Sequence, residues 1–232
     1  MAIDLEKGLE LRLGFVQDQR LHYSLHTRIY QEARDGDKVL GREENELHAG
    51  LMQRVLRVED DGSAHLVAVT MPVGQDLLKS PAAGPMRSVI YQHLDRRGEI
   101  LEISGPNPGS TYSFPAEPLS IGGTWKGVSR GYAPGRPDPI LTPYTYKIVG
   151  SEQRGDYDCL QIDVESDMID FESPLPDGRM TRVGIQTRGR MFFAPDPGIL
   201  VRLELKSLTT PKVEGFQFET HNTVTQELLK VE

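Results

Sequence analysis

Strict alternation of apolar and polar residues constrains this chain more than any other feature of its sequence. Every second position on both sides of the turn 194–198 belongs to one mainly apolar series. The series consists of Val183, Ile185, Thr187, Gly189, Met191 and Phe193 before the turn and of Ile199, Val201, Leu203 and Leu205 after it. A β-strand turns successive side chains to opposite faces, so this pattern indicates a hairpin with one buried and one solvated face. With the following segment to Leu229, it predicts three antiparallel strands.

The same period of two recurs along the rest of the chain. Strands are predicted at 21–29, 39–58, 64–71, 89–94, 99–104, 144–149 and 157–165, separated by turns rich in Gly, Asp and Pro. No segment carries a 3.6-residue apolar stripe longer than about two turns, so we expect little helix. The sequence therefore predicts an all-β fold, either a strongly curved antiparallel sheet (a half-barrel) or, as the alternative, a two-sheet β-sandwich.

The length of 232 residues suits one large all-β domain. We expect residues 1–232 to form a single domain made of two meanders, about 9–104 and 124–230, joined by the loop-rich connector 105–139. The prolines of that connector predict an extended stretch without strand pairing, before two glycines lead into a strand at Trp125. Segment 72–85 interrupts the strands and is expected to form a flap.

Composition excludes several classes of function. A net charge of −8 argues against binding to nucleic acid or to anionic membrane surfaces. The single cysteine, Cys159, excludes an intrachain disulfide and is expected to be an inert, half-buried thiol. No apolar run predicts a membrane span. The first residues lack the pattern of a secretory signal, which predicts a cytoplasmic protein if Met1 is the natural start and a cell-envelope protein if an export signal has been replaced.

Three stretches resemble parts of a known group of proteins. They are Phe114-Pro115 to Trp125, the Tyr146–Ile162 hairpin, and Phe193–Arg202 with its Pro-Asp-Pro-Gly turn. Together they make residues 110–206 similar to uncharacterised bacterial exported and lipoprotein β-domains. Some of those domains are similar to the curved-sheet carriers of the LolA/LolB type, which hold acyl chains against a concave apolar face.

The resemblance implies a non-enzymatic binding or envelope-associated module without a cofactor. Its ligand would be a hydrophobic or lipid-like molecule held in an apolar concavity under the 72–85 flap. We expect this concavity to be lined by Tyr23, Leu25, Trp125, Tyr146 and Phe193. The simpler interpretation of these aromatic residues is that they fill the core.

Two alternatives concern charged residues. An acidic run, Asp163 to Glu172, could supply the carboxylate pair of a glycan-directed hydrolase, although it lacks the regular spacing of a calcium loop. A basic face could instead bind a protein partner in a purely structural domain, and it consists of Arg182, Arg188, Arg190 and Arg202. Pairing of these arginines with neighbouring carboxylates is the simpler expectation.

Catalytic and metal-binding motifs are absent from the sequence. It contains no Gly-x-Ser-x-Gly elbow and no phosphate-binding glycine loop. His22 and His26 share one strand face, but at about 3.3 Å per residue they lie too far apart to hold one ion. The remaining histidines are scattered along the chain, at His48, His65, His93 and His221. Arg154-Gly155-Asp156 is expected to be a hairpin turn. We therefore predict no metal site and no catalytic residue.

Overall fold

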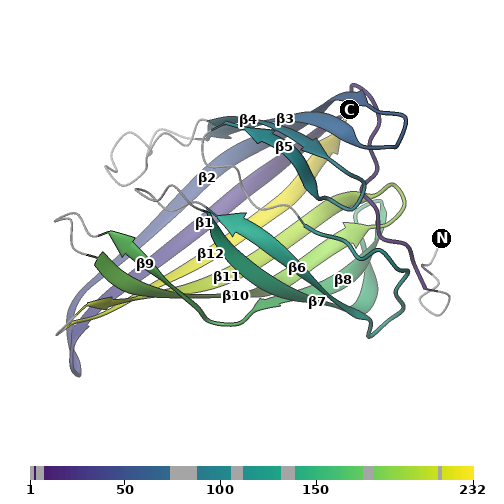
Figure 1. The fold of residues 1–232 in the computed structure, drawn as a ribbon. Helices are drawn as coiled ribbons and strands as arrows, with labels where there is room; N and C mark the ends of the chain where they lie inside the picture. Colours follow the sequence, from purple (N-terminus) through teal and green to yellow (C-terminus); the bar gives the residue numbers. More distant parts are fainter. Residues whose placement is uncertain are drawn as a thin grey trace.

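The chain folds into a single curved antiparallel sheet (Figure 1). The computed structural model describes Ile3 and residues 8–73, 88–105, 112–131, 139–174, 180–213 and 216–232. Within these ranges it contains twelve strands and no helix. The strands are β1 (Arg20–Asp35), β2 (Lys38–Val58), β3 (Ala64–Pro72), β4 (Ser88–Leu94), β5 (Ile100–Ser104), β6 (Thr124–Gly131), β7 (Ile140–Arg154), β8 (Tyr157–Ser166), β9 (Ile169–Pro174), β10 (Met180–Ala194), β11 (Ile199–Val213) and β12 (Phe216–Val231).

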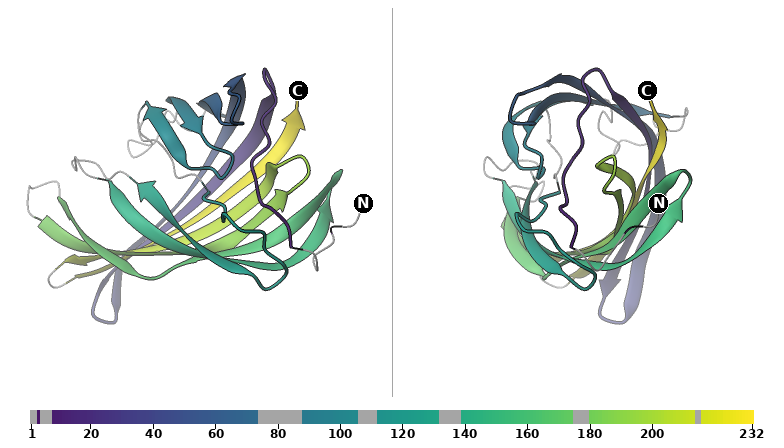
Figure 2. Two further views of the ribbon diagram at one scale, coloured as in Figure 1. Left: turned by 45° about the vertical axis from the view of Figure 1, so that its right-hand side comes forward. Right: turned by 90° about the vertical axis from the view of Figure 1, so that its right-hand side faces the viewer.

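Strand order explains the shape of the sheet. The strands follow the order β5-β4-β3-β2-β1-β12-β11-β10-β8-β7-β6, and β9 pairs with the free length of β10. The sheet curls around a hollow without closing (Figure 2). The predicted all-β antiparallel fold is confirmed, and the two-sheet sandwich is wrong because the described strands belong to one sheet. Strand β9 was not predicted, because its residues lie in the acidic run.

Residues 8–19, here called the N-terminal segment, cross the hollow in an extended conformation (Figure 2). Leu9 and Leu119 exchange two backbone hydrogen bonds of 2.8 and 2.9 Å, so the connector pairs at Leu119, contrary to the expectation from its prolines. The amide of Leu13 donates to the carbonyl of Arg96 at 2.7 Å. Leu11 is fully buried. The segment therefore acts as an internal strap between distant parts of the sheet.

Most of the concave face under β6–β8, β10 and β11 is filled by a core cluster. Its buried members are Leu11, Phe114, Trp125, Tyr146, Ile148, Leu160, Ile162, Val164, Met191, Phe193, Leu200 and Leu203. Trp125 stacks on Tyr146 with ring centroids 5.0 Å apart, and its Nε1 donates to the carbonyl of Ser113 at 2.7 Å. Burying one such side chain stabilises the fold by roughly 1.5–3 kcal/mol. This part of the hollow is a packed interior.

Packing differs on the other side of the hollow. A smaller cluster of Val55, Ala64, Leu66 and Leu94 packs against the N-terminal segment at Leu13 and Phe15. Most of the expected flap, residues 74–85, lies outside the described residues. This cluster and the N-terminal segment together line a space that remains in the hollow.

Candidate functional site: a cavity in the hollow of the sheet

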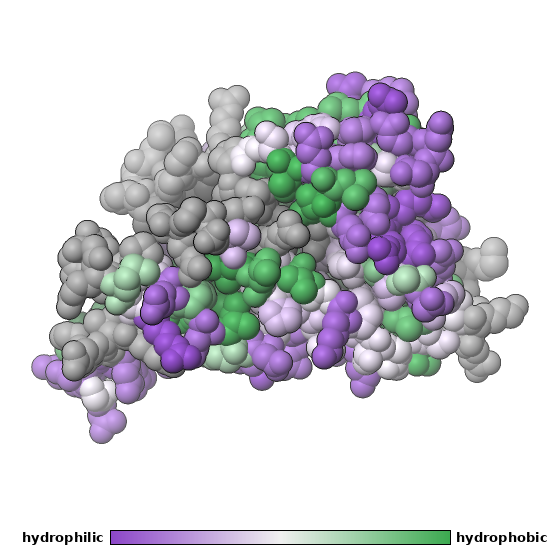
Figure 3. Space-filling model, viewed as in Figure 1, coloured by the Kyte–Doolittle hydropathy of each residue, from purple (hydrophilic) through white to green (hydrophobic). Residues whose placement is uncertain are grey.

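A cavity of about 350 Å³ lies between the N-terminal segment and strands β1–β4. Its main apolar walls are Leu13, Phe15, Leu21, Tyr23, Leu51, Val55, Leu66, Ala68, Ile90, Leu94, Tyr112, Ile199 and Leu200. In the space-filling view, hydrophobic residues gather along the middle of this side of the molecule, and hydrophilic residues lie to their right (Figure 3). Most of the cavity wall therefore consists of apolar residues on strands that the alternating pattern predicted.

Strand register brings the lining residues together in rows across the sheet. Leu21 of β1 lies opposite Gln53 of β2, which in turn lies opposite Ala68 of β3. Ala68 pairs with Ile90 of β4, completing the row. A parallel row runs from Tyr23 through Leu51, Thr70 and Ser88. Paired residues point to the same face, so each row adds one line of side chains to the cavity wall.

No charged side chain is among the lining residues that the structure describes. The polar groups are neutral, and they are the carboxamides of Gln19, Gln53, Gln92 and Gln226 with the hydroxyls of Tyr23, Thr70, Ser88 and Tyr112. The Oε1 atom of Gln19 is buried and has no hydrogen-bond partner. Leaving a buried acceptor unsatisfied costs roughly 1–3 kcal/mol. A ligand that donates a hydrogen bond to this atom would remove that cost.

Two tyrosines in the wall also stay uncharged. Burial raises the pKa of Tyr23 well above its usual range, and the proximity of Tyr157 adds to the shift. Burial likewise raises the pKa of Tyr112, with smaller contributions from neighbouring tyrosines. The phenols therefore remain neutral hydrogen-bonding groups at physiological pH.

The residues expected to line the concavity fall in different places. Tyr23 lines the cavity. Leu25 shares the strand face of Tyr23, opposite Ala49, but is not among the lining residues. Trp125, Tyr146 and Phe193 lie in the core cluster, where they pack against protein. Sequence reasoning missed Ala68 and the four glutamines, of which only Gln53 lies, like Ala68, within the strands predicted between 51 and 70.

Charged residues of the two alternative hypotheses lie together on the outer, convex face of the sheet, where they pair with each other. The ion pairs are Arg182–Asp170 at 2.7 Å, Arg188–Glu165 at 2.9 Å, Arg190–Asp163 at 2.7 Å, and Arg202 with Glu204 at 2.6 Å and Glu227 at 3.1 Å. Each of the four arginines of the predicted basic face therefore contacts a carboxylate of the same sheet. The acidic run and the basic face form one charge-paired surface.

Cys159 and the Arg154-Gly155-Asp156 tripeptide have structural roles. The thiol is fully buried, where a half-buried position was expected, and burial raises its pKa to about 11. The tripeptide forms the turn between β7 and β8, with Gly155 at a φ of +57°. The Arg154 guanidinium lies 3.6 Å from the centroid of the Phe192 ring, so this arginine packs against its own sheet.

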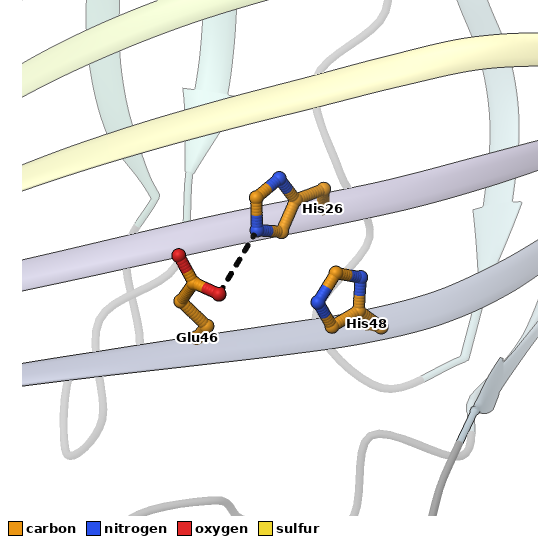
Figure 4. A group of neighbouring side chains, drawn as sticks. All are labelled: His26, Glu46 and His48. Carbon is orange, nitrogen blue, oxygen red and sulfur yellow. Dashed lines mark ion pairs between the residues drawn. The ribbon is translucent and has the colours of Figure 1, made fainter.

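A second group of polar residues lies on the outer face of the β1–β2 hairpin. His26 and His48 are opposite each other in the register, and their rings stack with centroids 4.4 Å apart and planes inclined by 6°. Glu46 approaches His26, with Oε2 and Nε2 3.9 Å apart (Figure 4). The spacing argument from the sequence considered only histidines along one strand, His22 and His26. It therefore missed the pair of His26 and His48, which arises from the register between two strands.

Comparisons with known proteins leave the chain without a family. No family model matches it, and no curated protein matches it. Among solved structures, it is similar to the crystal structure of Ail, the attachment invasion locus protein of Yersinia pestis. Sequence identity is 7%, the alignment covers 92% of this chain and 99% of that chain, and the TM-score is 0.22. A score this low supports no argument about function, and none of the comparisons supports a LolA/LolB-like assignment.

In the described part of the chain, no helix has the length and apolar character needed to cross a membrane.

Proposed function

We propose that this protein is a non-enzymatic binding module that holds a neutral, hydrophobic or lipid-like molecule in the cavity between the N-terminal segment and β1–β4. The observation that carries the proposal is a cavity of about 350 Å³ whose described walls are mainly apolar and carry no charged side chain. Ligand sites in proteins are mostly apolar, with volumes of roughly 300–1,000 Å³ and a few polar groups that fix orientation. The four glutamines supply such groups here.

The wall chemistry restricts the ligand. A buried carboxylate or ammonium loses its hydration and needs an opposite charge in compensation. The described walls offer no such charge, which favours an apolar body with a neutral polar end. A hydroxyl or amide N–H is the best match, because either can donate to the unsatisfied Oε1 of Gln19.

The hydrolase alternative has less support. Asp163, Glu165 and Asp170 lie in ion pairs with arginines on the outer face. No carboxylate is among the described residues that line the cavity. We also propose a location in the cell envelope. The ground for it is the resemblance of residues 110–206 to exported β-domains.

Ligand binding can be tested with one cavity-filling variant and one matched control. Ala68 lies in the cavity wall, whereas its neighbour Val67 points to the other face of β3. We expect the neutral dye Nile red to gain fluorescence with the wild-type protein, to bind at least about tenfold more weakly to Ala68→Phe, and to bind normally to Val67→Phe. Native mass spectrometry of the purified protein should reveal a retained small molecule.

The opposite results are equally clear. A folded Ala68→Phe protein that binds the dye as well as wild type would show that the cavity is not the binding site. If wild type binds no dye and carries no retained molecule, the structural-domain alternative is favoured.

A further inference from the structure

We infer that the outer face of the β1–β2 hairpin is a binding site for a divalent late transition-metal ion such as Zn²⁺, held by His26, Glu46 and His48. Imidazole nitrogen and carboxylate oxygen are the ligand types that Zn²⁺ and its neighbours in the periodic table accept. The site lies on the face opposite the cavity, so it does not depend on the proposed ligand binding.

Strand register places the three donors together. His26 pairs with His48 across the strands, and Glu46 lies two residues before His48 on the same face of β2. One candidate ligand atom from each residue lies within 4.8 Å of the others. Zn–N and Zn–O distances of roughly 2.0–2.2 Å put tetrahedral ligand atoms about 3.3 Å apart. The His26 and His48 rings lie in a near-parallel stack, so they must tilt out of it for both nitrogens to reach one ion.

His26 carries an independent sign of a missing partner. Its Nε2 atom is buried and makes no hydrogen bond. The nearest carboxylate oxygen, Oε2 of Glu46, is 3.9 Å away, which is too far for a hydrogen bond. Nε2 of His26 and Oε2 of Glu46 thus face each other across a gap of 3.9 Å (Figure 4). A cation between them would satisfy both.

Hydrogen bonds from Arg28 orient the Glu46 carboxylate so that one of its oxygens is left for a metal ion. Arg28 donates to Oε1 through Nε at 2.9 Å and through a terminal nitrogen at 2.6 Å. Both bonds go to Oε1 and leave Oε2 directed at His26. Arg28 also pairs with Glu44 at 3.4 Å, so its charge is shared between two carboxylates.

A second stacked pair, His65 and His93, shows why stacking alone does not make a site. Their ring centroids are 4.1 Å apart on the outer face of β3 and β4. Here Nδ1 of His65 contacts the Tyr91 hydroxyl at 2.6 Å, and Nε2 contacts Glu59 at 2.8 Å. Nε2 of His93 contacts Ser63 at 3.0 Å. These nitrogens already have partners, so the pair is a matched control.

The test is calorimetric titration of the intact protein with ZnCl₂. We expect one Zn²⁺ ion per wild-type chain and the same affinity for the double variant His65→Asn/His93→Asn. The double variant His26→Asn/His48→Asn should bind at least tenfold more weakly, since loss of an outer-shell partner alone weakens metal binding by about 10–100-fold. Titration with Co²⁺ should give visible absorption bands only where His26 and His48 are present.

Several results would overturn the inference. They are no heat of binding to wild type at a large excess of Zn²⁺, equal weakening in both double variants, or unchanged binding in His26→Asn/His48→Asn. If the His65/His93 variant is less stable than wild type, His22→Asn replaces it as the control, because His22 lies on the same face of β1 beside Glu232. Nile red binding by the His26/His48 variant separates a failure of this site from a failure of the cavity.

Discussion

The amide of Gly14 donates a 2.8 Å hydrogen bond to the carbonyl oxygen of Gly198, and this contact joins the N-terminal segment to the β10–β11 turn. Side chains cannot be added here without displacement of the backbone. A Cβ on Gly14 would lie 1.9 Å from the carbonyl oxygen of Pro197, and one on Gly198 would lie 2.4 Å from the amide nitrogen of Gly14. Both glycines line the cavity, so the contact fixes two of its walls relative to each other.

Gly14→Ala should therefore destabilise the protein and weaken dye binding together. Forcing extra atoms into a packed interior costs about 1–3 kcal/mol. Urea denaturation measures the loss. Gly41→Ala is the matched control, because a Cβ at Gly41 meets no atom within 4 Å. Equal stability of the two variants would show that the N-terminal segment can shift away from the β10–β11 turn at no cost in stability.

Gln19→Leu should discriminate between ligands without damaging the fold. The substitution removes an acceptor that has no partner, so the free energy of unfolding should stay the same or rise. A long-chain alcohol should lose affinity by roughly fivefold to tenfold, since about 1 kcal/mol of hydrogen bonding is lost. The alkane of the same length should bind unchanged. Competition with Nile red measures both, and equal effects on alcohol and alkane would contradict the assigned role of Gln19.

Glu32 makes the stability of the β1–β2 hairpin depend on pH. Its carboxylate accepts hydrogen bonds from Tyr30 at 2.7 Å, from Arg34 and from Arg42 at 2.7 Å, and these bonds lower its pKa from 4.5 to about 2. A carboxyl group whose pKa is lowered on folding stabilises the folded state at every pH above its pKa in the unfolded chain. This stabilisation is lost as the pH falls from about 4.5 through about 2.

Glu32→Gln should accordingly melt below wild type at pH 7, and the gap should narrow as the pH falls through that range. Thermal melts followed by circular dichroism between pH 7 and 2 provide the measurement. Glu117→Gln, in an exposed loop position, is the control. A gap for Glu32→Gln that stays constant down to the lowest pH would show that the carboxylate's charge does not matter to stability.

The thiol of Cys159 should be unreactive toward thiol reagents in the folded protein. It is fully buried and its pKa is raised to about 11, so at pH 8 it is protonated and shielded. Ellman's reagent should react slowly with the native protein and at once after denaturation. The native rate then measures how often this part of the sheet opens. Rapid reaction without denaturant would place the thiol at the surface.

Alternation predicted the strands well because it is a local property of the chain. The predicted strand 21–29 corresponds to β1, and the turn at 194–198 joins β10 to β11. β9 escaped prediction because it is short and acidic, and it exists through its pairing with one end of β10. The partner and register of such a short strand cannot be read from its own six residues.

The cavity and the histidine pair were beyond prediction for the same reason. Apolar residues alternate with other residues at the start of the segment 8–19, yet this pattern alone does not place the segment in the hollow. Its position there depends on contacts with Arg96, Leu119 and Gly198. Which glutamines meet in one wall depends on register, as does the position of His48 opposite His26. Three of the aromatic residues expected in the concavity, Trp125, Tyr146 and Phe193, lie instead in the packed core, where burial of their large surface is favourable.

Pairing of β1 with β12 has a consequence for biosynthesis. This central ladder joins an early strand to the last one, and Gln226 of β12 contributes to the cavity wall. Until β12 is made, the long strand β1 has an unpaired edge, which is a template for aggregation. Contacts between such distant segments also slow folding. A nascent chain therefore exposes this edge of β1 until β12 is made, and the cavity wall at Gln226 is completed only then.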